Sequence, residues 1–395
     1  MLIKSLAGLI AAAALGLFAG CSTMCAEPGA FCAPEVANTS GPPPPPPVAI
    51  PAPPGPAAMP QPTPNHTIRI ALLLPLKSST LAKAAEAVRD GFMAAWDHDR
   101  DGFLIDVIAT GDTPQEGLDA YARAAAEADI IVGPLTRSSI DLLAGSAVLI
   151  RPTIALSHSQ GVALPRQMLA VGLSNESEAD QVAQWAALEH PNGRALVLAG
   201  PAVWQQRIAK AFEASWADLG RYSQRVDLPI ENNTVDKDAL DQLGVRVGVD
   251  RPELLFAALD PNELRQVRSA LVLVIPSYGT SSINPGEPGT KVPELDGIRL
   301  VDLPWVVLHD NPGVMAYPRR HASGQALDLD RMYALGIDAF RIARQVVQHP
   351  NAPFTLDGVT GLLTISFDGT TQGFARKEAP VIYQDGAFHP AQGTR

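Results

Sequence analysis

From Thr67 onward, short apolar runs alternate with segments that repeat apolar residues at helical spacing. The run IRIALLLPL at 68–76 is almost wholly apolar, which is typical of a strand buried on both faces. Hydroxyl residues at 78–80 can cap the helix that the spacing predicts at 81–96. The alternation continues with predicted strands at 103–110, 130–135 and 152–157, and predicted helices at 113–129 and 138–148. Such a βαβα order implies a parallel sheet with helices on both faces.

The same alternation starts again after residue 172 and predicts a second sheet. Strands are expected at 194–200, 252–259 and 270–276, and helices at 178–190 and 203–220. A long helix is expected at 329–349, followed by strands at 361–367 and 379–384. The predicted fold class is therefore α/β, with two doubly wound lobes. Ligands of such sheets bind at the carboxyl ends of the strands, so the cleft between the lobes is the natural site.

The composition agrees with a large folded body and excludes several classes of function. Hydrophobic residues make up 46% of the 395 residues, which is enough apolar material for a large core. A formal net charge of −11 argues against nucleic-acid binding and against a polybasic membrane patch. The 3 cysteines are too few for a disulfide-built scaffold or a four-thiolate metal site.

Residues 1–20 read as an export signal, in which Lys4 precedes a short apolar run. The run ends in LFAGC, which resembles the lipobox of bacterial lipoproteins. The resemblance implies that the signal is cut before Cys21, that the Cys21 thiol is diacylated, and that the new N-terminus is acylated. The sequence departs from the usual pattern at Phe18, where leucine is common. The absence of Asp at Ser22 favours sorting to the outer membrane, and the alternative is an ordinary signal peptide with an unlipidated cysteine.

Residues 21–66 are expected to form a flexible tether. Proline dominates the stretch 33–65, and it fixes φ and removes a backbone donor, so neither helix nor sheet is predicted. An extended polyproline II tether of this length reaches about 140 Å, at ~3.1 Å per residue. Cys25 and Cys32 precede the proline-rich stretch, where they either pair in the oxidising periplasm or remain two free thiols.

Hydroxyl side chains that follow two predicted strands are the candidate ligand-binding residues. Thr136 and Ser138 stand at the start of a predicted helix, where they either cap it or help its backbone donors to hold an anion or carboxylate. Ser157 and Ser159 follow the next strand, where they either cap a loop or line the cleft. Tyr278 lies near a predicted strand end, where it either packs in the core or stacks on a ligand.

No motif predicts a catalytic residue, a metal site or a cofactor. The segment DHDRDG at 97–102 is like the start of a calcium loop, but its twelfth position is Ile108 rather than a carboxylate. The 8 histidines show no i, i+4 pair. The sequence contains no Walker loop, no G-x-G-x-x-G and no G-x-S-x-G elbow, so it predicts neither a nucleotide cofactor nor a serine nucleophile.

The segments that carry a family likeness are IALLLPLKSSTLAKAAEAVRDGFMAA (70–95), IIVGPLTR (130–137), LDGIRLVDLPWVV (295–307), RMYALGIDAFRIA (331–343) and LDGVTGLLTISFDG (356–369). Together they resemble the LppC/LpoA family, the lipoprotein activators of penicillin-binding proteins. The resemblance implies the type I periplasmic-binding-protein fold, in which the chain crosses between the lobes three times. Crossings are expected near Gly172, Pro304 and Pro350. They divide the chain into a first lobe at 67–172 and 305–350 and a second lobe at 173–304 and 351–395.

The resemblance also implies a function without catalysis. Family members are outer-membrane lipoproteins that bind a bifunctional class A penicillin-binding protein and stimulate its transpeptidase. Long members carry an N-terminal helical-repeat domain, and here the proline-rich tether occupies its place. The alternative is a lipid-anchored receptor of an ABC transporter that closes on an amino acid or similar solute. A cell-wall hydrolase is disfavoured because the sequence shows no catalytic constellation.

Overall fold

The structure is a computed structural model that describes residues 67–391, apart from 272–273, 287–288, 290, 321–326 and 368–371. The predicted export signal, the lipid attachment at Cys21, the pairing of Cys25 with Cys32 and the tether lie outside the described residues. All described residues fall within one compact unit of the chain.

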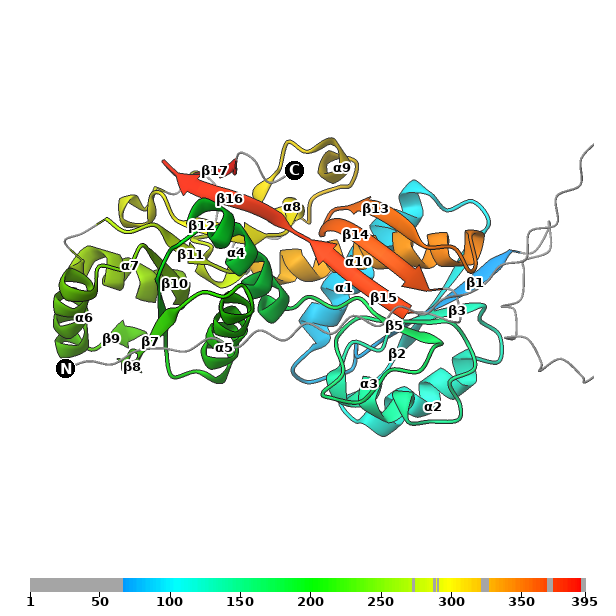
Figure 1. Ribbon diagram of the computed structural model, residues 1–395. Coiled ribbons are helices and arrows are strands. Elements are labelled where there is room, and N and C mark those ends of the chain that lie inside the picture. The colour runs from blue at the N-terminus through cyan, green and yellow to red at the C-terminus, as the bar shows by residue number, and fades with distance from the viewer. Residues whose placement is uncertain are drawn as a thin grey trace, which may run out of the picture. The chain divides into compact units, whose positions relative to one another are not determined.

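The first sheet is parallel, with the strand order β2-β1-β3-β4-β5 (Figure 1). Its strands are β1 (Ile68–Leu74), β2 (Phe103–Ala109), β3 (Ile130–Val132), β4 (Thr153–Ala155) and β5 (Met168–Ala170). Helices α1 (Ala82–His98) and α10 (Leu327–Gln348) cover one face, and α2 (Pro114–Ala124) and α3 (Arg137–Ala144) cover the other. Leu72 and Ala71 of β1 belong to the cores on these two faces, which explains the unbroken apolar run. This sheet with its helices is called the first lobe below.

Helix α10 comes late in the chain but packs closely on α1 of the first lobe. A Cβ at Gly91 in α1 would lie 1.9 Å from the backbone oxygen of Tyr333. A Cβ at Gly336 in α10 would lie 2.0 Å from the backbone oxygen of Val88. The two glycines therefore allow the helix backbones to touch, a close approach that larger residues would prevent.

The second sheet has the strand order β17-β16-β12-β11-β10-β6-β7. Its strands are β6 (Ala195–Ala199), β7 (Ser223–Asp227), β10 (Leu254–Ala258), β11 (Ser277–Gly279), β12 (Arg299–Asp302), β16 (Ala379–Gln384) and β17 (Ala387–Pro390). The strands from β7 to β12 are parallel, whereas β16 is antiparallel to both of its neighbours. Helices α4 (Asn175–Glu189) and α5 (Val203–Asp218) cover one face, and α6 (Lys237–Asp250) and α7 (Pro261–Ala270) cover the other. This sheet with its helices is called the second lobe.

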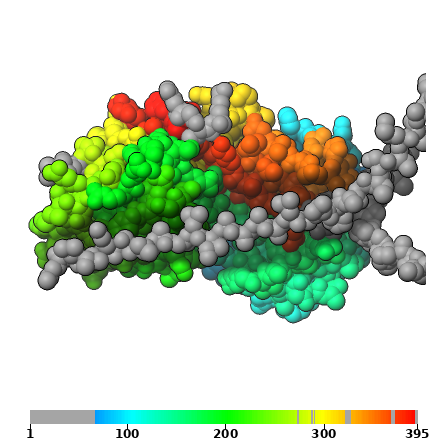
Figure 2. Space-filling model, viewed as in Figure 1, coloured from blue at the N-terminus to red at the C-terminus, as the bar shows by residue number. Residues whose placement is uncertain are grey.

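The remaining described elements are short. They are β8 (Ile230–Glu231), β9 (Thr234–Val235), η1 (Ser281–Ile283), η2 (Pro293–Leu295), α8 (Pro304–Val307) and α9 (Pro312–Met315). A separate antiparallel sheet is formed by β13 (Phe354–Gly358), β14 (Gly361–Phe367) and β15 (Gln372–Lys377). Its orange strands lie at the surface in the view of Figure 2.

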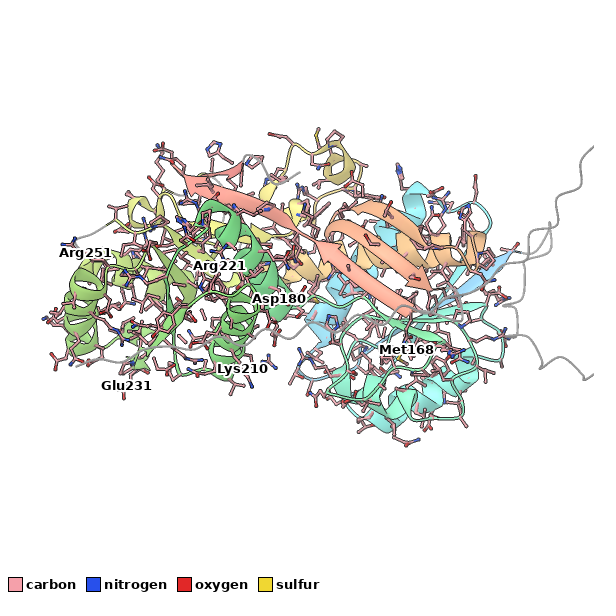
Figure 3. The ribbon with its side chains drawn as sticks, viewed as in Figure 1. Met168, Asp180, Lys210, Arg221, Glu231 and Arg251 are labelled. Atoms are coloured by element: carbon pink, nitrogen blue, oxygen red, sulfur yellow. The ribbon has the colours of Figure 1, made fainter. Side chains whose placement is uncertain are left out.

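The chain connects the lobes through short segments. After β5 it passes through Val171 and Gly172 into α4, so that Met168 and Asp180 lie on either side of this connection (Figure 3). After β12 it passes through Pro304 into α8 and, later, α10. The chain enters the second sheet again only where Glu378 joins β15 to β16. The division at residue 350 stays a prediction, because β13–β15 form a sheet of their own between α10 and β16.

The two sheets, each with a parallel set of strands covered by helices on both faces, confirm the predicted α/β fold class. The predicted strand at 270–276 is wrong: its described residues lie outside any strand, and β11 begins at Ser277. The reason lies in α7, which was not predicted. Asp260 caps the start of the helix and exchanges hydrogen bonds with Glu263, and the helix extends to Ala270, the first residue of the predicted strand.

Candidate functional site

A pocket of about 590 Å³ lies at the carboxyl ends of strands of the second sheet, where a doubly wound sheet places its ligand. Its walls come from the first turns of α4, α5, α7 and α10 and from η1. The lining residues are Leu173, Asn175, Glu178, Trp204, Asp260, Pro261, Ser281, Ser282, Asn284, Leu303, Leu327, Asp328, Arg331 and Met332.

Glu178 of α4 is a buried acid in this pocket. Its carboxylate accepts a hydrogen bond from the Ser281 backbone nitrogen at 2.7 Å and another from the Ser281 hydroxyl at 3.0 Å. Burial, together with the negative charge of Asp302, raises the pKa of Glu178 to about 8. The group is therefore largely neutral at pH 7.

Arg331 of α10 faces Asp302 at the end of β12 in a two-point ion pair. Its Nη2 and Nε donate to the two carboxylate oxygens at 2.7 and 3.1 Å. The remaining donors bind the Ser281 carbonyl at 3.1 Å and the Asp328 carboxylate at 2.9 Å. Asp302 also accepts hydrogen bonds from the side chain of Asn284 and the backbone of Leu303.

These bonds decide what the pocket can do chemically. A receptor for an amino acid must offer one group to the ligand's carboxylate and another to its ammonium. Here the acid Glu178 is bonded to Ser281, and the base Arg331 is bonded to Asp302, Asp328 and Ser281. Both charged side chains therefore already have protein partners: Glu178 has Ser281, and Arg331 has Asp302, Asp328 and Ser281.

A second buried cluster adjoins the first and contains Arg376 of β15. Its Nη1 and Nη2 donate to the carbonyls of Gly172 and Val171, each at 2.7 Å. Its Nε donates to the Thr360 hydroxyl at 3.1 Å, and that hydroxyl in turn donates to Asp338 at 2.7 Å.

Glu378, between β15 and β16, is a buried acid within this second cluster. Its backbone nitrogen donates to the Gln181 side chain at 2.9 Å. Its Oε2 has no hydrogen-bond partner among the described residues. Burial and the nearby Glu178 carboxyl raise the pKa of Glu378 well above its usual range, which favours the neutral acid.

The hydroxyl residues singled out in the sequence lie in the first lobe, and none of them lines the pocket described above. Thr136 is the N-cap residue of α3, and its hydroxyl donates to Ser139 at 2.7 Å; Ser138 lies in the first turn of that helix. The Ser159 hydroxyl donates to the Val162 carbonyl at 2.8 Å. Ser157 packs against Gly172, where an added Cβ would lie 2.5 Å from its Cα. A ligand-binding role for these residues stays a prediction.

Tyr278 of β11 is fully buried against α4. Its hydroxyl donates to Glu189, and a ring nitrogen of His190 lies 3.1 Å from the same oxygen. Its ring meets that of Trp185 edge to face, at 5.5 Å between centroids. These contacts place Tyr278 in a packed core, apart from the residues that line the pocket at the strand ends.

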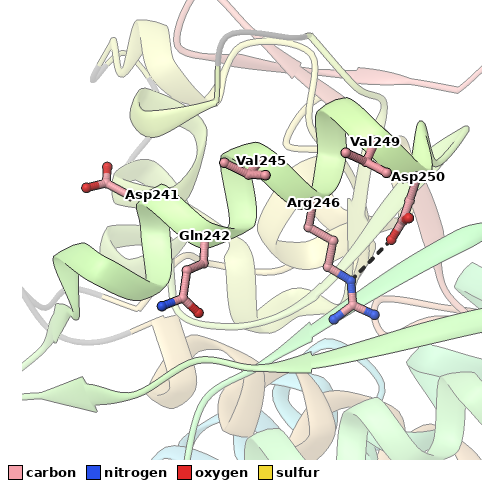
Figure 4. A pocket seen from close by; sticks show the side chains of 6 residues that line it. All are labelled: Asp241, Gln242, Val245, Arg246, Val249 and Asp250. Carbon is pink, nitrogen blue, oxygen red and sulfur yellow. Dashed lines mark hydrogen bonds and ion pairs between the residues drawn. The ribbon is translucent and has the colours of Figure 1, made fainter.

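Two further hollows involve helices of the second lobe. One, of about 480 Å³, follows the exposed side of α6, where Val245 and Val249 are 69% and 75% exposed (Figure 4). Its polar side chains include the ion pair of Arg246 with Asp250, at 3.3 Å. The other, of about 540 Å³, lies between α4 and the strands β14 and β15, with Leu188 and Leu362 exposed at its edge. Neither presents a set of converging catalytic groups.

Within the described ranges, no three His, Cys, Asp or Glu side chains are grouped to hold a metal ion. None of the described helices combines the length and the apolar character needed to cross a bilayer.

The comparisons with known proteins agree with the resemblance noted in the sequence. The family described as "LppC putative lipoprotein" matches residues 63–386. A "Penicillin-binding protein activator LpoA" of Vibrio vulnificus is 27% identical over 339 residues, covering 76% of this chain and 55% of that protein. A protein of the same description from Vibrio cholerae is 24% identical over 331 residues, covering 75% of this chain and 54% of that protein. The chain thus spans about half the length of the curated relatives it matches.

Two solved structures share the fold. The C-domain of Haemophilus influenzae LpoA, described as a regulator of PBP1A, has a TM-score of 0.66 at 23% identity, covering 82% of this chain and 99% of that one. A Chromobacterium violaceum protein described as a "putative branched-chain amino acid ABC transporter" has a TM-score of 0.66 at 32% identity, covering 80% of this chain and 100% of that one. Because the family match extends over nearly the whole folded body, the chain belongs to the LppC family.

Proposed function

We propose that this chain is a lipid-anchored binding protein that docks on a class A penicillin-binding protein and stimulates its transpeptidase. Family membership supports the proposal, because the matched relatives are described as penicillin-binding protein activators rather than as enzymes. This chain matches about half of the length of those relatives. The proposal therefore assigns the activator function to the matched part.

The observation that favours a protein-binding body over a solute receptor is the state of the pocket at the strand ends. Glu178 and Arg331 would be the natural groups for an ammonium and a carboxylate. Both are bonded to protein groups, and Arg331 also makes a two-point ion pair with buried Asp302. A ligand would have to break these bonds before it could bind, which lowers its net affinity.

The proposed site of action is the periplasmic side of the outer membrane. The lipobox-like sequence at Cys21 and the absence of Asp at Ser22 support an outer-membrane anchor. Several acyl chains give stable anchoring, at ~0.8 kcal/mol per buried methylene. The proline-rich stretch that follows gives the folded body reach toward a synthase of the inner membrane.

The test is a cross-linking assay with the purified full chain, a class A penicillin-binding protein and its lipid-linked substrate. We expect the chain to bind the synthase and to raise the fraction of cross-linked product. The matched control is the same synthase with its transpeptidase blocked by a β-lactam, for which the chain should no longer change cross-linking. Absence of both binding and stimulation would overturn the proposal.

A second candidate function is favoured by one comparison. The Chromobacterium violaceum protein, described in terms of branched-chain amino acid transport, shares 32% identity across 80% of this chain. If the chain were a receptor, leucine, isoleucine or valine would bind with saturable heat in calorimetry, and a class A synthase would not respond to the chain. If calorimetry detects no binding heat with these amino acids and the chain stimulates the synthase, the receptor function is excluded and the activator function is supported.

A further inference from the structure

Buried polar side chains hold the backbone at the first connection between the lobes. Arg376 donates to the carbonyls of Val171 and Gly172, the first residues after β5. A hinge bends by changing φ and ψ at such linker residues, and their carbonyls turn with them. Arg376 is only 9% exposed, so a bend here would leave a buried cation without its acceptors.

The second connection is held by an ion pair that joins the two lobes. Arg331 lies on α10, which packs on α1 of the first lobe. Its partner Asp302 ends β12 of the second lobe and is completely buried. The 2.7 and 3.1 Å bonds of this pair, with the bond from Arg331 to the Ser281 carbonyl, tie α10 to two strand ends of the second sheet.

The third connection belongs to the same network. Asp338 of α10 accepts from the backbone nitrogens of Val359 and Thr360 at 3.1 and 2.7 Å. The Thr360 hydroxyl also donates to Asp338 and accepts from Arg376. Beyond Arg376, Glu378 is the one residue between β15 and β16, and Figure 1 shows β15 running on into β16. The backbone nitrogen of Glu378 donates to the Gln181 side chain of α4 at 2.9 Å, which holds this connection to the second lobe.

We propose that this network locks the connections, so that the folded body is one rigid unit and its lobes do not close around a ligand. Each connection has at least one buried charged or hydrogen-bonded group that a hinge motion would strip of its partner. Lobes joined by short linkers move by default unless their interface is large and hydrophobic. Here one continuous cluster of buried side chains, which includes Leu72 and Leu255, spans both sheets, and the buried ion pairs and hydrogen bonds add to that contact. The inference concerns the body alone, and it stands whether or not the chain activates a synthase.

Single-molecule energy transfer tests the lock on the full mature chain. Dyes would be placed on Arg123→Cys of α2 and Lys210→Cys of α5, both exposed positions on different lobes, after replacement of the native cysteines by serine. We expect a single narrow distance distribution that stays unchanged when leucine, isoleucine or valine is added. Two interconverting populations, or a shift toward a shorter distance with an amino acid, would overturn the proposal.

The variant Arg376→Gln removes the cation that holds the first connection, and we expect it to broaden the distance distribution. The matched control is Arg221→Gln, because Arg221 likewise donates to backbone carbonyls, those of His190 and Ala187, but within the second lobe (Figure 3). This control should leave the distribution as narrow as in the wild type. A folded Arg376→Gln variant with an unchanged distribution would also overturn the proposal. If Arg376→Gln does not fold, the wild-type distance distribution and that of Arg331→Lys decide in its place. Lysine cannot make the two-point pair with Asp302, so we expect a broader distribution, and an unchanged one would overturn the proposal.

Discussion

Glu178 is a carboxyl group enclosed by protein, and its environment has a consequence for stability. Asp302, Arg331, Glu378 and the Ser281 hydroxyl surround it, and its pKa rises from 4.5 to about 8, mainly through burial. Between these values the folded state holds a proton that the unfolded state has released. The contribution to stability is therefore complete below 4.5 and is lost as the pH rises to 8. The slope approaches about 1.4 kcal/mol per pH unit.

We predict that Glu178→Gln removes this slope, because glutamine keeps an acceptor for Ser281 without carrying a titratable proton. The free energy of unfolding, measured with denaturant across the range from 4.5 to 8, should show an advantage for the variant that grows with pH. The control is Glu127→Gln, whose side chain is 78% exposed, and for which the difference from wild type should stay nearly constant. A constant difference for Glu178→Gln as well would contradict the prediction.

Asp302 has a different part in the same cluster, because it supplies the charge that Arg331 needs. Removing one partner of a buried ion pair leaves an uncompensated charge, so Asp302→Asn should lower the free energy of unfolding by about 3 kcal/mol. Asp97→Asn is the control, since the Asp97 pair with Arg100 is more than half exposed and should change stability by less than about 1 kcal/mol. If the two substitutions changed the free energy of unfolding equally, the buried pair would contribute no more to stability than the exposed one.

The sequence offered little to identify these residues. Glu178 and Ser281 lie 103 positions apart, and neither periodicity nor motif spacing can bring them together. The available signal was a lone acid inside an apolar segment, as with Asp338 in YALGIDAF and Asp302 in RLVDLPW. Such an acid must find partners when it is buried, but the sequence does not say which ones. The hydroxyl residues were easier to single out because they follow strands directly, yet the described pocket at the strand ends lies on the other sheet.

At the scale of elements, the hydrophobic patterns in the sequence predicted the positions of most of the helices and strands named in the sequence analysis. The strands predicted at 361–367 and 379–384 have the bounds of β14 and β16. Helix α6 was not predicted: it contains Gly244 and Gly248, and only Leu243 and Val247 are buried in it. A helix with such a narrow apolar stripe gives a weak periodic signal, and its formation depends on packing against the rest of the second lobe.

The contact between α1 and α10 makes a prediction about single glycines. Gly336→Ala places a methyl group 2.0 Å from the Val88 backbone oxygen, far inside van der Waals contact, so the helices must separate. We expect a loss of about 1–3 kcal/mol in the free energy of unfolding. Gly248→Ala in α6 is the matched control, because nothing lies within 4 Å of the added methyl group. It should stabilise the protein by about 0.5–1 kcal/mol through helix propensity, and thermal unfolding of both variants measures the contrast.

At the scale of the whole molecule, the two lobes share more than their connections. Leu72 of the first sheet and Leu255 of the second belong to one continuous cluster of buried side chains. The ionic network crosses the same region, since Arg331 of α10 binds Asp302 of β12. Separation of the lobes would therefore expose apolar surface and, at the same time, leave buried charges without their partners. A body built in this way should unfold as a single cooperative unit, although it contains two sheets.

Native-state hydrogen exchange tests this cooperativity strand by strand. We predict that the amides of β1 and β10, which are interior strands of their sheets, exchange through openings of equal free energy. Asp302→Asn should then lower both values by the same amount, about 3 kcal/mol, even though Asp302 lies in the second lobe. If the substitution weakened protection in β10 and left β1 unchanged, the lobes would be independent folding units. A shared core would transmit the destabilisation to every strand that depends on it. An unchanged β1 would therefore show that the buried network joins the two lobes without making them one cooperative unit.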